Sequence, residues 1–220
     1  MKVEQSVWTP GGWRDQPSLG DAQLVLVFGH RTALSDGGLA PALSKAWPSA
    51  SVIGCSTAGQ ILGTEVLDEG AVATAVRFDH TRVASTTAPA SATGSAESGK
   101  RLAAQLAGDH LVHVLVLSEG IDINGDALVR GMREGLPPHV SVSGGLSADG
   151  EAFRETRVLA DGRAERNTAA AIGLYGSHLK VGCGSLGGWD SFGPERQVTR
   201  ASGNVLYELD GQSALALYKR

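Results

Sequence analysis

The chain repeats one order of elements, and this repetition limits the folds open to it more than any other feature. A continuous apolar run at 24–28 is typical of a fully buried strand, and residues 39–46 carry apolar side chains at helical spacing. A second buried strand is predicted over 51–55. The same order returns over 112–145. We therefore expect two related units rather than two unrelated domains.

In sequence, the two copies align without a gap. Sliding residues 24–59 by 90 positions onto 114–149 gives six identities in 36 and places strand on strand and helix on helix. Ser35 or Asp36 is the expected N-cap of the first helix, and Asn124 is that of the second. We predict an α/β fold, in the layered α+β sense. Two pseudo-repeated β-α-β-β-β units form mixed sheets covered by helices, with αββα as one such layering.

Further strands are expected to complete each unit as hairpins. In the first unit, residues 72–78 and 82–86 are predicted to pair antiparallel around a turn at Asp79–His80. The second unit is predicted to continue with strands over 153–159, 164–174 and 179–183.

Composition suggests where the units begin and end. Residues 1–21 are rich in turn-forming residues and are expected to be a lead-in that tucks Trp8 and Trp13 against the body. Small and polar residues gather over 85–98, which favours a linker. The expected division is a first unit over about 22–87, a linker over 88–96 and a second unit over about 97–200.

Charge and hydropathy exclude several classes of protein. With 23 acidic and 19 basic residues, the net charge of −4 offers no basic excess for nucleic acid. No apolar run approaches the roughly 18 residues of a membrane span, and the first residues contain no apolar signal segment. We therefore expect a cytoplasmic protein with neither a membrane nor a nucleic acid as its partner. Cys55 and Cys183 are too few for a disulfide scaffold or a four-cysteine zinc site.

The predicted ligand site consists of two small-residue turns, 54–59 and 143–148, which follow the second strand of each unit. Ligands of α/β sheets usually lie beyond the carboxyl ends of strands, where helix N-termini also favour anions. We expect backbone N–H groups and hydroxyls of these turns to hold an anionic group. Two polar residues would pair with an amino group, and one aromatic residue would close the pocket. The candidate residues are Gly54, Cys55, Ser56, Thr57, Gly144, Gly145 and Ser147 in the turns, Asp122 and Asn124 for the amino group, and Trp189 as the closing residue.

Two other kinds of chemistry are open to these residues. Cys55 or Ser56 would be the nucleophile of a hydrolase if a base lay beside it. His30, at the end of a predicted strand, is the candidate axial ligand if haem is bound. The chain has none of the spacings typical of histidine and cysteine metal sites, so no metal is expected otherwise. A pure interaction domain without a ligand is the remaining alternative.

Several segments, taken in order, resemble the FIST N-terminal domain family. Val52–Gly59 is similar to that family's Gly-Cys-Ser-Thr segment, and Val142–Leu146 is similar to its Gly-Gly turn. The other similar segments are Leu117–Gly120, Asn124–Asp126, Gly173–Gly176, and the stretch from Gly187–Asp190 to Leu209–Tyr218. The resemblance covers roughly residues 20–218, although Gln60 stands where the family usually has an acidic residue.

This resemblance implies a sensory domain of signal transduction that binds a small ligand without catalysis, and the Ala-, Gly- and Arg-leaning composition suggests a bacterial source. Amino acids are among the ligands proposed for the family, and some members are haem proteins that sense nitric oxide. It implies a downstream signalling domain or protein as partner. Because a C-terminal FIST domain usually follows the segment at 209–218, residues 209–220 are expected to begin a linker toward such a domain. In that case the ligand pocket can lie between the two domains.

Overall fold

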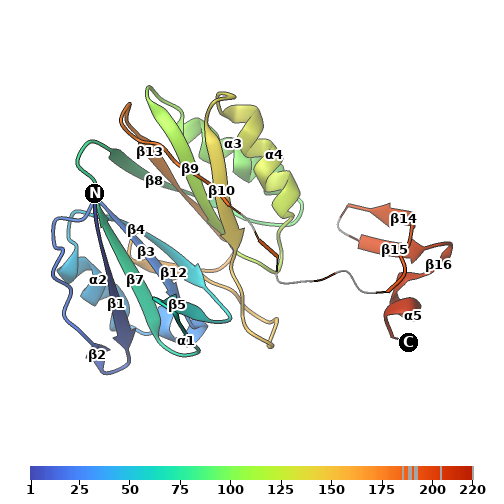
Figure 1. Cartoon of the computed structure of the whole chain (residues 1–220), viewed down its shortest axis with the longest axis horizontal. Helices are drawn as coiled ribbons and strands as arrows, with labels where there is room; N and C mark the ends of the chain where they lie inside the picture. The colour runs from blue at the N-terminus through green and yellow to red at the C-terminus, as the bar shows by residue number, and fades with distance from the viewer. Residues whose placement is uncertain (185, 188–189, 191–192, 204, 220) are drawn as a thin grey trace. The chain divides into compact units, whose positions relative to one another are not determined.

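The computed structural model describes all of the chain except residues 185, 188–189, 191–192, 204 and 220 (Figure 1). The chain divides into two compact units, residues 1–182 and 183–220. The first unit contains both predicted copies. The second is a small three-stranded sheet with one short helix. Its elements are β14 (Val198–Ser202), β15 (Val205–Leu209), β16 (Gln212–Ser213) and α5 (Ala214–Tyr218).

A seven-stranded mixed sheet forms one layer of the first unit. Its strand order is β12-β11-β4-β3-β7-β1-β2, with β3 and β4 parallel at its centre. Two short helices, α1 (Arg31–Leu34) and α2 (Leu39–Ala46), connect β3 to β4. The strands are β1 (Lys2–Thr9), β2 (Gly12–Trp13), β3 (Leu24–Gly29), β4 (Ser51–Ser56), β7 (Ala71–Arg77), β11 (Val158–Ala160) and β12 (Arg163–Glu165).

A four-stranded sheet forms the second layer, with the order β10-β9-β13-β8 and with β9 and β10 parallel. Its outer face is covered by two longer helices, α3 (Ser95–Leu106) and α4 (Gly125–Gly135) (Figure 1). The strands are β8 (Arg82–Pro89), β9 (Leu111–Ser118), β10 (Ser141–Leu146) and β13 (Thr168–Tyr175). Strands β5 (Gln60–Leu62) and β6 (Glu65–Leu67) form a separate hairpin.

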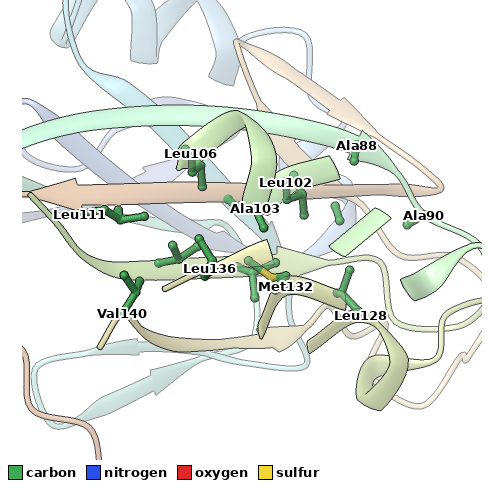
Figure 2. Packing of buried hydrophobic residues seen from close by; sticks show 14 of the residues in the cluster. Ala88, Ala90, Leu102, Ala103, Leu106, Leu111, Leu128, Met132, Leu136 and Val140 are labelled. Atoms are coloured by element: carbon green, nitrogen blue, oxygen red, sulfur yellow. The ribbon is translucent and has the colours of Figure 1, made fainter. Parts of the chain in front are cut away.

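Three apolar clusters hold these layers together. One joins the two sheets and includes Ile53, Cys55 and Ile172. A second lies between the smaller sheet and its helices, where Leu102 and Met132 are fully buried (Figure 2). The third lies between the larger sheet and α2. The order of layers is therefore helix, sheet, sheet, helix, which confirms the predicted layered α/β fold. No helix among the described residues is long and apolar enough to cross a membrane.

Three tryptophans stack on the outer face of the larger sheet. The rings of Trp8 and Trp13 meet edge to face with centroids 5.2 Å apart, and those of Trp13 and Trp47 do so at 5.5 Å. Trp47 is only 1% exposed, and its Nε1 donates to the carbonyl of Leu19 at 2.9 Å. The turn-rich start of the chain is thus attached to the body through its tryptophans. It also contains β1, a full strand of the larger sheet.

The two sheets share one topology. In chain order, β1, β3, β4 and β7 take the same places in the larger sheet as β8, β9, β10 and β13 in the smaller one, with the same parallel and antiparallel senses. Val25 pairs with Val52, and Val114 pairs with Val142. The first strands therefore correspond at an offset of 89 and the second at 90, so the alignment needs one gap between them.

Several local predictions were wrong, each for a physical reason. Residues 72–78 and 82–86 do not pair, because β7 lies in the larger sheet and β8 in the smaller. Neither Ser35 nor Asp36 caps α2. The unexpected turn α1 occupies the preceding residues, and α2 begins at Leu39 with Gly38 as its N-cap and no side-chain cap. The outcome of the other local predictions was mixed. Asn124 caps α4 as predicted, residues 179–183 form no strand, and β8 and α3 leave only residues 90–94 as a connection.

Candidate functional site

One loop, residues 147–157, forms hydrogen bonds to the carboxyl ends of both β4 and β9. The backbone N–H of Ala148 donates to the carbonyl of Ser56 at 2.8 Å, and that of Ser147 donates to the carbonyl of Ser118 at 2.8 Å. The N–H of Arg157 donates to Ser56 Oγ at 3.0 Å. The two predicted turns therefore meet, because this loop bonds to the end of each sheet.

Most polar groups of the first turn are already engaged within the protein. The N–H of Ser56 donates to the carbonyl of Arg157, and the N–H of Thr57 donates to that of Gly29. Ser56 is fully buried, and Thr57 Oγ1 donates to the side-chain amide oxygen of Gln60 at 3.1 Å. Strand β4 is also paired on both sides, with β3 and β11. The N–H groups of Ser56 and Thr57 are therefore used in contacts with the 147–157 loop and with Gly29, and they do not point at open space.

The buried carboxylate of Glu119 is the most unusual group at this end of the molecule. It directly follows β9 and is 4% exposed. One carboxylate oxygen, Oε2, accepts from the N–H of Ile121 at 3.1 Å and from Thr156 Oγ1 at 3.3 Å. The other, Oε1, is buried and has no hydrogen-bond donor among the described residues; the same holds for the neighbouring hydroxyl of Ser118. Buried polar atoms are nearly always paired, so an ordered water or a bound ligand is the expected partner of each of these two atoms.

An ion pair holds the 147–157 loop to the end of β3. Arg31 Nε lies 2.9 Å from Asp149 Oδ1, and the Asp149 side chain is 4% exposed. The other oxygen of Asp149 accepts from the N–H groups of Arg154 and Glu155. Burial alone would raise the pKa of Asp149, but these two hydrogen bonds and the charge of Arg31 outweigh it and lower that pKa below its usual value. The carboxylate therefore stays ionised at neutral pH, and the loop stays attached.

The other predicted site residues lie apart from this cluster. Asn124 uses its side chain to accept from the N–H of Ala127 as the cap of α4, and Asp122 is an exposed loop residue. Gly144 and Gly145 lie on the outer strand β10. Together with α4 they line a mostly apolar groove of about 380 Å³ that includes Leu128, Val129 and Leu146. Trp189 lies outside the described residues.

Sequence reasoning missed four residues of this cluster: Arg31, Ser118, Glu119 and Thr156. Ser118 and Glu119 carried a usable signal, since they are two polar residues directly after a continuous apolar strand. Arg31 and Thr156 carried none, because their partners Asp149 and Glu119 are distant in the chain, Glu119 by 37 residues and Asp149 by more than a hundred. Among the described residues, no group of three potential metal ligands is found.

Cys55 lies in the hydrophobic core between the two sheets. It is 3% exposed within the cluster between the sheets, and burial raises the pKa of its thiol to about 12. The thiolate needed for nucleophilic attack is therefore scarce at neutral pH. His30 accepts from the N–H of Thr32 as the cap of α1.

We expect the two thiols to differ sharply in reactivity. A thiol reagent added to the folded protein at neutral pH should modify one cysteine per chain, because Cys183 is exposed and Cys55 is not. Denaturant should release the second thiol. The Cys183→Ser variant isolates Cys55. Rapid modification of this variant while it remains folded would contradict the assignment and revive the hydrolase alternative.

Comparison with known proteins identifies the family. The model of the FIST N domain matches residues 23–212, which is most of the chain. No protein with a curated description matches. The match spans the smaller sheet, the larger sheet apart from β1 and β2, the 147–157 loop and the cluster around Glu119. The chain therefore belongs to the FIST N domain family, a family of sensory domains in signal transduction.

Proposed function

We propose that this domain binds a small amine-bearing metabolite of the amino-acid kind at the Glu119 cluster, without transforming it. The observation that carries the proposal is the buried Oε1 of Glu119, which lacks a donor in the described protein. A buried carboxylate oxygen is costly without a donor, and an ammonium group supplies both a donor and the opposite charge.

The same loop offers a group for the other end of such a ligand. Arg31 pairs with Asp149 of the 147–157 loop, and its side chain remains 32% exposed. A guanidinium in this position can add a ligand carboxylate to its existing partner, since it has five N–H donors. Ligand entry to Glu119 requires the 147–157 loop to move, because Glu119 and Thr156 are both buried. Movement of this loop would also alter the contacts of Ser56 and Ser118. Ligand binding would thereby alter contacts in both sheets, and a sensory domain needs such a change of conformation to pass on a signal.

Ligand specificity tests this proposal directly. Thermal unfolding would be followed with amino acids, with the matching carboxylic acids that lack the amine, and with simple amines. We expect amine-bearing compounds to raise the midpoint; a ligand at 100 times its Kd adds about 2.7 kcal/mol to the free energy of unfolding. The compound giving the largest shift would then be titrated by calorimetry.

A matched pair of variants separates Glu119 from the exposed acid predicted from sequence. Glu119→Gln removes the charge and keeps the size, and should weaken binding about ten- to a hundredfold, as expected for a hydrogen bond to a charged group. Asp122→Asn should leave binding unchanged. Circular dichroism and the midpoint without ligand report whether each variant folds. Equal affinity of the wild type and a folded Glu119→Gln variant would refute the proposal, as would binding that depends on Asp122.

A further inference from the structure

The outer strand β10 has none of the features that usually protect a sheet edge. In the described part of the chain, it is hydrogen-bonded to β9 alone. Its six residues, Ser141–Leu146, include no charged residue and no proline. The other outer strands differ from it, because β8 begins with Arg82 and ends with Pro89, β12 carries Arg163 and Glu165, and β2 has only two residues. Natural proteins use charge, proline and shortness to prevent edge pairing, so a neutral edge of this length indicates a covered one.

The matching edge of the other sheet shows what covers such a strand. Strand β4 holds the same place beside β3 as β10 does beside β9. The outer edge of β4 is covered by the β11–β12 hairpin, with Leu159 paired antiparallel to Gly54. The β11–β12 hairpin follows β10 in the chain. The β5–β6 hairpin directly follows β4, so in the first half of the chain it takes the place that β11–β12 takes in the second half.

The β5–β6 hairpin exposes apolar side chains. Ile61 and Val66 are register partners across it, and they are 68% and 67% exposed. In the described structure the hairpin forms a sheet of its own instead of joining either larger sheet. A two-stranded hairpin is only marginally stable by itself, and further pairing would stabilise it.

The surface beside β10 is complementary to this hairpin. The groove of about 380 Å³ between β10 and α4 is mostly apolar, and Val129 and Leu146 on its two sides are 40% and 48% exposed.

We propose that the β5–β6 hairpin of one copy adds to strand β10 of a second copy, and that two such contacts form a twofold dimer. The apolar pair Ile61 and Val66 enters the groove beside Leu146. Each copy gives one hairpin and receives one, so the arrangement closes at two copies. In the dimer each β10 edge is covered by a hairpin, as the β4 edge is covered by β11–β12 within one chain.

Sedimentation across the micromolar range tests this proposal on the whole chain. We expect the wild type to be dimeric, and Ile61→Lys or Leu146→Lys to weaken dimerisation at least tenfold, because each puts a charge into an apolar contact. Both side chains are largely exposed in one copy, so folding should be retained. Val3→Lys is the control, since Val3 is 55% exposed on β1 and lies outside the contact.

A mixture of the two variants gives the sharpest result. Each mixed pair contains one contact with both substitutions and one contact with neither. Ile61→Lys mixed with Leu146→Lys should therefore associate more strongly than either variant alone. A monomeric wild type would overturn the proposal. So would a dimer that both variants leave unchanged, or one that the mixture does not restore.

Discussion

Replacing Trp47 with alanine is expected to lower the free energy of unfolding by about 3–5 kcal/mol, the usual range for truncating a buried aromatic residue. Trp47 is 1% exposed and meets the ring of Trp13 edge to face. Its indole N–H also holds the carbonyl of Leu19, which the substitution would leave without that donor. The cavity, the lost ring contact and the unpaired carbonyl all act in the same direction. In thermal unfolding, this corresponds to a midpoint lower by about 6–20 °C.

Trp47→Phe is the matched control for this prediction. It keeps an aromatic ring in the core and removes the indole N–H, so only about 0.5–1.5 kcal/mol of the loss should come from the hydrogen bond. Urea unfolding of wild type and both variants gives the two differences. An alanine variant no less stable than the phenylalanine variant would show that the tryptophan stack contributes little. The segment before β3 would then be attached mainly by the pairing of β1 with β7.

Patterns within one element were sufficient to predict the central strands of both sheets and the helices α2 and α4. Continuous apolar runs marked β3, β4 and β9, because strands buried on both faces cannot alternate with polar residues. The cap Asn124 was predictable, since the residue type, the following apolar stripe and the preceding loop all agreed. The order of these elements also indicated layers of sheet and helix.

Pairing between distant elements could not be predicted in this way. The turn at Asp79–His80 has the residues of a hairpin turn, yet it carries the chain from the larger sheet to the smaller one. Turn residues determine that the chain reverses, but they do not determine whether the next strand pairs with the last. The candidate site could not be predicted fully for the same reason, because it depends on contacts between distant segments. The predicted turns meet, but only because residues 147–157 bond to Ser56 and Ser118. Glu119 is distinctive only through its burial, which a single sequence does not show.

The glycines of the predicted ligand turns provide the second large effect. Adding a methyl group at Gly54 or Gly144 is expected to lower the free energy of unfolding by about 1–3 kcal/mol or more, as for other overpacked cores. A Cβ at Gly54 would lie 2.0 Å from the carbonyl oxygen of Val27, and one at Gly144 would lie 1.8 Å from that of Val116. These two positions correspond in the two sheets. In each case the second parallel strand approaches the backbone of the first too closely for a side chain.

Gly145→Ala is the control, because a Cβ at Gly145 meets nothing within 4 Å. Urea unfolding of Gly54→Ala, Gly144→Ala and Gly145→Ala should therefore separate the first two variants from the third. If these glycines instead served a ligand, the order would differ: Gly54→Ala would keep its stability and lose affinity for the amine-bearing compound. The structure favours the first outcome, since both glycines face a backbone carbonyl of the neighbouring strand. The requirement for glycine at both positions then follows from sheet packing, and the proposed ligand site depends on the loop that bonds to the two strand ends.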